Sequence, residues 1–390
     1  MIYLDNAATT PLHPKALEAM LPYLQGSFGN ASAAYGLARQ AQKAIDDARR
    51  SVGNVLCTRP SDVVFTSGGT ESINAALKGV AFAQKKARAG NHIVTTEIEH
   101  HAVLHTANYL EEFGFEVTYV SVDRDGMVDP EEVARAVTDR TVLVSVMLAN
   151  NEVGTIEPVA EVAKLVAERG RQMRRRIPVH TDAVQAPGAL PLEVDSLGVD
   201  LLSLSGHKFG GPKGTGVLYI RRGTPYVSQI AGGGQERQRR AGTENVAGIV
   251  GQSVALTLAE EAREQHVQTN QRLRDRLIES ILAAVPDSRL NGHPTQRLAN
   301  NVNISFRGVR GDALVKALDK EGFAVSAGAA CGSSTWEPSH VLLAMGLSMS
   351  EAVGGLRITF SPETTEADLE ALVKALPGCV AGLRSLAASR

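Results

Sequence analysis

Residues 63–72 read Val63-Val64-Phe65-Thr66-Ser67-Gly68-Gly69-Thr70-Glu71-Ser72, a short β-rich run that passes through two glycines into the start of a helix. Toward Tyr219 the alternation continues, with β-rich runs at 92–95, 116–120, 141–148, 178–181 and 199–205 and helix-period stripes at 103–113 and 159–166. Repeated strand-helix units predict an α/β fold with a mostly parallel central sheet that is covered by helices on both faces.

The C-terminal part of the chain has a different pattern. Residues 251–285 contain no Pro and, after Gly251, no Gly, which predicts one long helix linking two domains. After Pro286, an alternating run at 302–306, a helix-period run at 314–318 and a strand at 356–360 predict a second, smaller α+β domain.

Composition limits the function classes. The 390 residues are 43% hydrophobic and 21% charged, as in ordinary globular proteins, and the formal net charge of −2 provides no positive field for nucleic acid. Cys57, Cys331 and Cys379 lie far apart without a Cys-x-x-Cys pair, so neither a disulfide framework nor a metal site is expected. With no leader and no apolar stretch of about 20 residues, we expect a cytoplasmic protein that contacts no membrane.

Ligands of parallel α/β sheets bind beyond the carboxyl ends of the strands, where four segments carry polar residues. At 67–72, glycines followed by a helix start can hold a phosphate on unpaired N–H groups, although an ordinary turn capped by Thr70 is the alternative. Residues 149–152 (Ala-Asn-Asn-Glu) and 180–185 (His-Thr-Asp-Ala-Val-Gln) place amides and a carboxylate at the same rim, where Asp182 alone would be an ordinary helix cap.

The fourth strand end, residues 205–208, reads Ser-Gly-His-Lys. Burial and nearby cations would lower the ammonium pKa of Lys208 and make it a Schiff-base nucleophile, whereas a surface lysine in a flexible loop is the alternative. The glycines that follow precede a strand, which argues against a dinucleotide fingerprint. A lysine, a carboxylate at Asp182 and a phosphate cradle are the three groups that pyridoxal phosphate needs, so this cofactor is predicted, though not the reaction.

Cys331 lies in a run of small residues at 326–334. No bulky side chain there can anchor a core, so we expect Cys331 to react and Cys57 and Cys379 to be structural. Because a free thiol of pKa ~8.5 is only a few per cent thiolate at neutral pH, a base or cation is required, which the sequence does not identify.

Together these motifs resemble the cysteine desulfurases that serve iron–sulfur cluster and nitrogenase assembly, over nearly the whole chain. The segments that carry the resemblance are 3–10, 65–72, 99–100, 149–152, 180–185, 205–208, 240–245, 337–340, the Cys331 loop and Arg357. The resemblance implies a fold-type I homodimer that depends on pyridoxal 5'-phosphate. It also implies a large cofactor-binding domain at 15–262 and a small domain, 1–14 with 263–390, that carries the Cys331 loop.

The resemblance also implies roles for single residues. Lys208 would form the Schiff base, Asp182 would pair with the ring nitrogen, and His100 would stack on the ring and assist proton transfer. The remaining cofactor contacts would come from Gly69, Thr70, Asn151, Gln185, Ser205, His207 and, toward the phosphate of the neighbouring subunit, Thr243. Asn151 and Arg357 would bind the substrate carboxylate.

The implied reaction converts L-cysteine to L-alanine and leaves a persulfide on Cys331, which passes sulfur to an iron–sulfur scaffold or a sulfur-carrier protein. No resident metal is expected, although Cys331 would transiently contact a cluster in the acceptor. An aminotransferase or a selenocysteine lyase is the nearer alternative, and a non-catalytic cofactor-binding regulator is the distant one. The sequence does not identify the sulfur acceptor.

Overall fold

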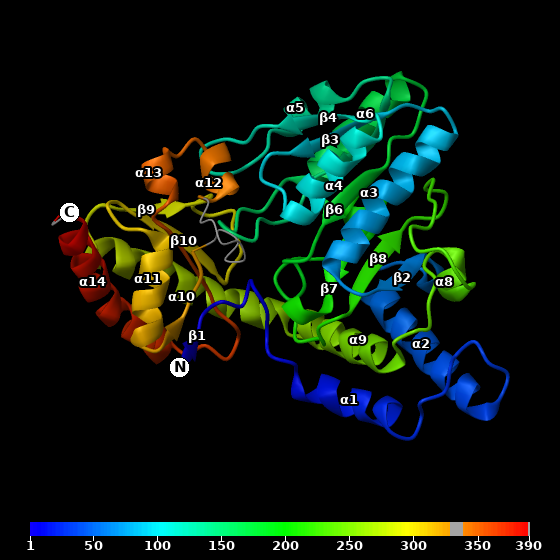
Figure 1. Ribbon diagram of the computed structural model, residues 1–390, viewed down its shortest axis with the longest axis horizontal. Coiled ribbons are helices and arrows are strands. Elements are labelled where there is room, and N and C mark those ends of the chain that lie inside the picture. Colours follow the sequence, from blue (N-terminus) through cyan, green and yellow to red (C-terminus); the bar gives the residue numbers. More distant parts are fainter. Residues whose placement is uncertain (328–337, 389–390) are drawn as a thin grey trace.

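The computed structural model describes residues 1–327 and 338–388 and is built around one large sheet (Figure 1). The sheet has the strand order β2-β8-β7-β6-β5-β3-β4. Its strands are β2 (Val63–Thr66), β3 (His92–Thr96), β4 (Glu116–Val120), β5 (Thr141–Ser145), β6 (Val179–Asp182), β7 (Leu201–Ser205) and β8 (Gly216–Ile220). Neighbouring strands are parallel except around β8, which is antiparallel to β2 and β7. The predicted mostly parallel sheet is confirmed.

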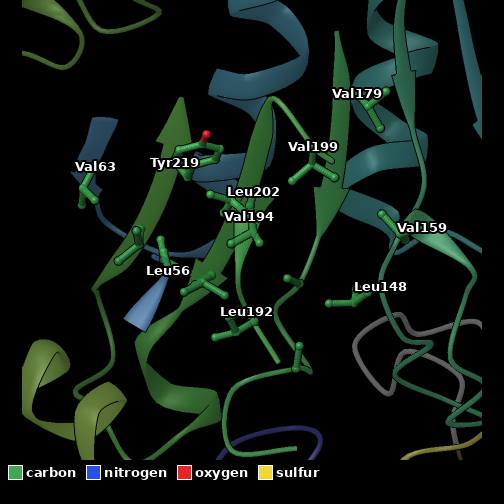
Figure 2. Packing of buried hydrophobic residues seen from close by; sticks show 14 of the residues in the cluster. Leu56, Val63, Leu148, Val159, Val179, Leu192, Val194, Val199, Leu202 and Tyr219 are labelled. Atoms are coloured by element: carbon green, nitrogen blue, oxygen red, sulfur yellow. The ribbon is translucent and has the colours of Figure 1, made fainter. Parts of the chain in front are cut away.

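Helices cover both faces of this sheet. One face carries α3 (Gly69–Lys86) and α4 (His101–Glu112), and the other carries α2 (Gly36–Val55), α6 (Val159–Gln172) and α9 (Val246–Glu261). Figure 2 shows part of the core on the face covered by α2, α6 and α9, where Leu56 and Leu192 pack near Leu202 of β7. Each fully buried leucine or valine contributes about 1.5–3 kcal/mol, and burial on both faces explains why these strands read as continuous apolar runs.

A second hydrophobic core forms around a three-stranded antiparallel sheet. In this sheet β10 (Asn301–Phe306) lies between β12 (Gly355–Thr359) and β9 (Ser288–Asn291). The helices α10 (Arg263–Ala284), α11 (Gly311–Lys320) and α14 (Glu366–Ala388) contribute to the core. Leu4 belongs to the same core, and β1 (Ile2–Tyr3) pairs in parallel with β11 (Phe323–Ala324). The division of the chain into a large domain at 15–262 and a small domain at 1–14 with 263–390 stays a prediction. It is consistent with the residues that form the cores of the large and the small sheet.

The predicted single helix over 251–285 is wrong. The chain forms α9 and α10, which are separated by Ala262. α9 packs against α1 (Pro14–Leu24) and α2, whereas α10 packs against α14 and β9. Since the two helices serve different cores, tertiary packing interrupts a segment whose composition alone favours one helix. The remaining helices are α5 (Pro130–Ala136), α7 (Val194–Leu197), α8 (Gln235–Gln238), α12 (His340–Ala344) and α13 (Met349–Ala352).

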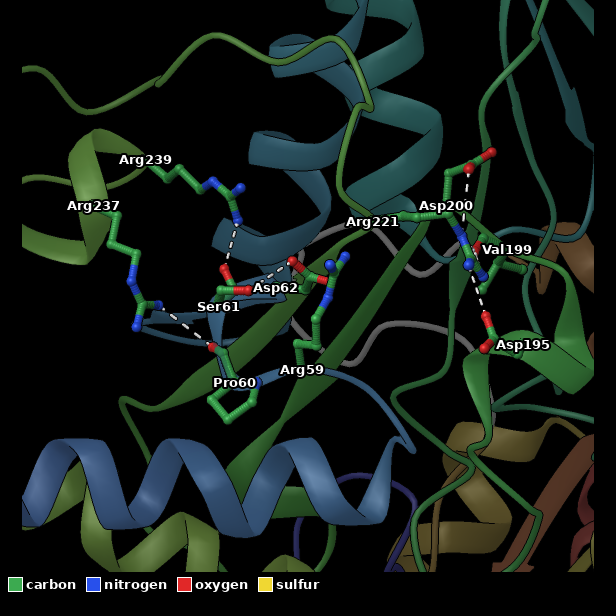
Figure 3. Close-up of polar contacts among 10 residues, drawn as sticks. All are labelled: Arg59, Pro60, Ser61, Asp62, Asp195, Val199, Asp200, Arg221, Arg237 and Arg239. Carbon is green, nitrogen blue, oxygen red and sulfur yellow. Dashed lines mark hydrogen bonds and ion pairs between the residues drawn. The ribbon is translucent and has the colours of Figure 1, made fainter.

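The amino ends of the parallel strands carry a paired polar cluster (Figure 3). Arg59 pairs with Asp62 at 3.1 Å, and Arg221 pairs with Asp195 at 2.7 Å, beside a cavity of about 500 Å³. These paired charges lie at the base of the sheet, and Cys57, an exposed free cysteine, lines the same cavity. None of the helices in residues 1–327 and 338–388 has the length and apolar character needed to cross a membrane.

Candidate active site

A cavity of about 640 Å³ lies at the carboxyl ends of the parallel strands. It brings together ten of the predicted site residues: Gly69, Thr70, His100, Asn151, Asp182, Gln185, Ser205, His207, Lys208 and Arg357. The strand predicted at 141–148 ends at Ser145, yet the amides of Val146 and Leu148 still donate to carbonyls of β6. The chain therefore stays beside β6 as far as the cavity.

Lys208 follows directly on β7, in the short helical turn Gly206–Lys208. Its Nζ donates to the carbonyl oxygens of Ala7 at 2.5 Å and Ala8 at 2.9 Å. Burial, and then the nearby Arg357 guanidinium, lower the pKa of the Lys208 ammonium to about 8, although Asp182 acts in the opposite direction. A lowered pKa is what a lysine that forms a Schiff base requires, because only the free amine is nucleophilic.

Asp182 ends β6, the strand next to β7, and is 5% exposed. Its Oδ1 accepts a hydrogen bond from the amide of Val184 at 2.9 Å, and burial raises the pKa of the carboxyl to about 6. On the same strand, the His180 ring bonds the hydroxyl oxygens of Ser145 and Ser203, each at 2.9 Å. Burial lowers the pKa of His180 to about 3, so a neutral ring joins three strands and fixes the base of the site.

The phosphate-binding features lie where α3 begins. Gly68 caps this helix without a side-chain hydrogen bond, so the first N–H groups are free for an anion. A Cβ at Gly69 would meet Val184 Cγ2 at 3.0 Å and Ser205 Cβ at 3.2 Å, so glycine permits the close approach of α3 to β7. Burial and the Lys208 charge lower the pKa of His207 to about 4, and its Nδ1 lies 3.0 Å from Thr9 Oγ1.

Arg357, on β12, is the cation at the opposite wall and is 5% exposed. Its Nη1 donates to the carbonyl of Asn151 at 3.0 Å and its Nη2 to Asp5 Oδ1 at 2.8 Å, while its buried Nε has no hydrogen-bond partner. The two residues predicted to bind the substrate carboxylate are therefore in contact. A carboxylate that enters the cavity would meet a guanidinium whose Nε–H forms no hydrogen bond with the described residues.

The N-terminal segment 5–10 was missing from the predicted site residues. Besides the Asp5 contact, Ala7 accepts from Gln185 Nε2 at 3.1 Å, and Thr10 Oγ1 donates to the carbonyl of His207 at 3.0 Å. The signal was present in the sequence, because residues 3–10 carry polar side chains that neither a strand nor a helix cap explains. Only the fold reveals that they face Lys208.

Imidazole rings line a third wall. His100 is the N-cap of α4 and its Nδ1 accepts from the amide of Ala102 at 3.1 Å, which places the ring proton of the neutral form on Nε2. Burial is the main cause, and the positive charge of Lys208 the second, that lowers the pKa of His100 to about 4. His101 and His340, which the prediction omitted, have ring centroids 4.7 Å apart and also line the cavity.

This donor set fits pyridoxal 5'-phosphate. Lys208 would bind the cofactor covalently, Asp182 would pair with its ring nitrogen, and the α3 N-terminus with Ser205 and His207 would hold its phosphate. When bound, the cofactor supplies an electron sink for charge that develops on the substrate carbon. Where the structure describes the chain, no group of three or more His, Cys, Asp or Glu side chains is placed to hold a metal ion.

Two predicted residues are not part of this arrangement. Thr243 is exposed and does not line the cavity, so its contact with a neighbouring subunit stays a prediction. Cys331, the predicted nucleophile, lies outside the described residues, as does most of its small-residue run. Glu152, which does line the cavity, is a carboxyl group that the prediction passed over.

Fold and site together define an enzyme that uses pyridoxal 5'-phosphate. The model of the family "Aminotransferase class-V" matches residues 2–372. Over 385 residues, 99% of this chain and 93% of the relative, the protein is 48% identical to "Cysteine desulfurase IscS" of Methanosarcina thermophila. It is 46% identical to the protein of that name from Clostridium botulinum, over 99% of this chain and 96% of the relative.

Solved structures agree with these relatives. A "NIFS-LIKE PROTEIN" superposes with a TM-score of 0.90 at 38% identity, covering 98% of this chain and 99% of the other. "SspA in complex with cysteine" superposes with a TM-score of 0.81 at 36% identity, covering 94% and 100%. The chain therefore belongs to the class-V aminotransferase family, in its cysteine desulfurase branch.

Proposed function

We propose that this protein converts L-cysteine to L-alanine and receives the sulfur atom on Cys331 as a persulfide. The observation that carries the proposal is one cavity in which Lys208 and Asp182 lie at adjacent strand ends and face Arg357. The relatives named cysteine desulfurase and the neighbour with bound cysteine favour this substrate over a transamination partner.

Each wall of the cavity has a separate task. Arg357 and the amide of Asn151 bind the carboxylate of cysteine and orient its Cα toward Lys208. The Lys208 amine, with its lowered pKa, takes the Cα proton and later returns a proton to carbon. Neutral His100 holds a proton on Nε2 and can donate it within the cavity.

The transfer of sulfur to Cys331 requires no oxidant or reductant other than the thiolate and the substrate. The Cys331 thiolate attacks the substrate sulfur, so an S–S bond forms while the Cβ–S bond breaks and its electron pair stays with carbon. Protonation of that carbon completes alanine. A thiol reductant or an acceptor thiolate then removes the outer sulfur from Cys331.

The test is to add cysteine and a thiol reductant to the purified protein and to measure alanine and sulfide for the wild type and for Cys331→Ser. Equal amounts of both products, lost on substitution, would support the proposal. Turnover that survives Cys331→Ser would remove Cys331 from the mechanism and favour a lyase or aminotransferase that depends on Lys208 alone.

We further propose a cytoplasmic homodimer that passes sulfur to an iron–sulfur scaffold or a sulfur-carrier protein. The exposed position of Thr243 supports a contact with a second subunit, since its own cavity does not use it. Three cysteines without a close pair in the sequence support a reducing compartment. Size-exclusion chromatography with light scattering tests the dimer, and capture of proteins by the Cys331 persulfide tests the acceptor.

A further inference from the structure

Glu152 is a buried carboxyl group of the cavity to which the proposed chemistry assigns no task. It is 4% exposed, and its Oε2 accepts a hydrogen bond from the Ser339 hydroxyl at 2.5 Å. Burial raises the pKa of Glu152 to about 7, against the opposing effects of Ser339 and Arg357. A carboxyl group is costly to bury, so its contact with one serine requires a reason beyond filling space.

The backbone of Glu152 is fixed on both sides. Its backbone N–H donates a hydrogen bond to Asn150 Oδ1 at 2.8 Å. Its carbonyl oxygen accepts from Asn303 Nδ2 of β10 at 3.0 Å, so the residue is held between the large and the small sheet. The side chain of Glu152 therefore extends from a fixed backbone and can hold a neighbouring segment in one position.

Ser339 is the residue that Glu152 holds in place through this hydrogen bond. The serine is 2% exposed and is the N-cap of α12, where its Oγ accepts from the amide of Leu342 at 3.1 Å. The next residue, His340, has its Nε2 3.0 Å from the carbonyl oxygen of Glu99. Two polar contacts thus fix the first turn of α12 at the cavity wall.

Apolar packing alone would hold α12 near this wall. Val341, Leu342 and Met345 pack with Ile98, Met147 and Val153 in a small separate core. Such packing tolerates small shifts, whereas a buried hydrogen bond with both partners fixed allows one position. The hydrogen bond between Glu152 and Ser339 therefore fixes the position of a helix that apolar packing already holds near the wall.

We propose that Glu152 is a positioning residue for sulfur transfer, which holds Ser339 and so sets the start of α12, the point from which the chain leads back to Cys331. In the sequence Ser339 follows Cys331 by eight residues, so a shift of this anchor changes where the thiol can reach.

A second anchor lies on the other side of Cys331 in the sequence. The Ser326 amide donates to the Arg357 carbonyl oxygen at 3.2 Å, and the Arg357 amide donates to the Ser326 carbonyl oxygen at 2.7 Å. Both anchors thus lie beside Asn151 and Arg357, the two residues that the proposed function assigns to the substrate carboxylate. The inference rests on the proposed function and deepens it.

The test compares Glu152→Gln, Glu152→Leu and Ser339→Ala in the cofactor-loaded protein. Glutamine keeps an oxygen that accepts from Ser339, whereas leucine and the alanine variant remove the bond. We expect the rate of Cys331 persulfide formation in one turnover, followed by mass spectrometry, to fall tenfold or more in the Leu and Ala variants. The Gln variant should stay within about threefold of the wild type, and the content of bound cofactor should be unchanged in all three variants.

A matched control exists on the neighbouring helix. Ser348 caps α13 and its hydroxyl donates to Glu351 at 2.6 Å, the same chemistry at an exposed site away from the cavity. Ser348→Ala should therefore leave persulfide formation unchanged. Hydrogen exchange of the Leu342 amide reports the anchor itself and should quicken at least tenfold in Glu152→Leu and Ser339→Ala but not in Glu152→Gln.

Each outcome is decisive. Unchanged exchange and unchanged persulfide formation in Glu152→Leu and Ser339→Ala would overturn the proposal. Equal loss in Glu152→Gln and Glu152→Leu would overturn it too, because the carboxyl proton and not the hydrogen bond would then matter. If the wild type forms neither alanine nor persulfide, the proposed function fails instead, while hydrogen exchange still reports whether Glu152 fixes α12.

Discussion

The burial of Lys208 sets how fast the cofactor-free protein captures pyridoxal 5'-phosphate at each pH. Only the free amine can attack the cofactor aldehyde, so the capture rate should follow the amine fraction. With a pKa of about 8, about 10% of Lys208 is free amine at pH 7, against about 0.03% for a lysine with the ordinary value of 10.5. The structure therefore predicts an advantage of about 300-fold at neutral pH, with burial as its main cause.

Stopped-flow absorbance after mixing the cofactor-free protein with cofactor, between about pH 6 and pH 10, measures this rate. It should rise about tenfold from pH 6 to 7, reach half its maximum near pH 8 and level off above about pH 9. Arg357→Met removes the main neighbouring positive charge and should move the midpoint to higher pH. Lys208→Ala should abolish covalent capture, and Lys213→Ala, at an exposed lysine, should preserve the profile. A rate that keeps rising tenfold per pH unit to pH 10 would refute the reasoning.

Three further substitutions follow from the structure. Asp182→Asn keeps the shape of the side chain but removes the carboxylate, so we expect kcat to fall by about 100-fold or more while the bound cofactor, measured by absorbance, remains. Arg357→Lys loses the planar guanidinium, so steady-state assays should give a KM for cysteine at least about tenfold higher with a smaller change in kcat. Glu236→Ala strands the Arg49 guanidinium, which is 6% exposed and bonded at 2.6 and 2.9 Å, and should lower the free energy of unfolding by about 3–5 kcal/mol in urea titrations. Its control, Glu116→Ala, breaks an exposed pair with Arg140 at 2.5 Å and should hardly move the urea midpoint.

Local pattern was enough to predict the sheet and the strand ends of the site. β4 begins and ends at the residues of the predicted run 116–120, because its Val, Thr and Tyr residues prefer strands. Asp182 and Lys208 could be paired from the sequence because the carboxyl ends of neighbouring parallel strands meet at one edge. Those residues required only the order of elements and not their packing.

Other parts of the site depend on contacts that the sequence order hides. Asp5 and Arg357 are 352 positions apart, and Glu152 and Ser339 are 187 apart, so no window of sequence brings either pair together. The break at Ala262 has the same origin, since it follows from which core each helix meets. Long-range packing decided these features, and local propensity did not.

The first ten residues explain how two separate cores can share one site. Leu4 is buried in the core of the small sheet, and the chain then crosses to the large sheet, where Thr10 bonds the carbonyl of His207. Between these points, Asp5 accepts from Arg357 at 2.8 Å and Ala7 accepts from Lys208 at 2.5 Å. The segment therefore fixes the distance between the Arg357 guanidinium, which we propose binds substrate, and the Lys208 amine, because both are hydrogen-bonded to the same short piece of chain. Any relative movement of the two cores must stretch or release these bonds, so the geometry that catalysis needs is set by contacts and not by the stiffness of either core alone.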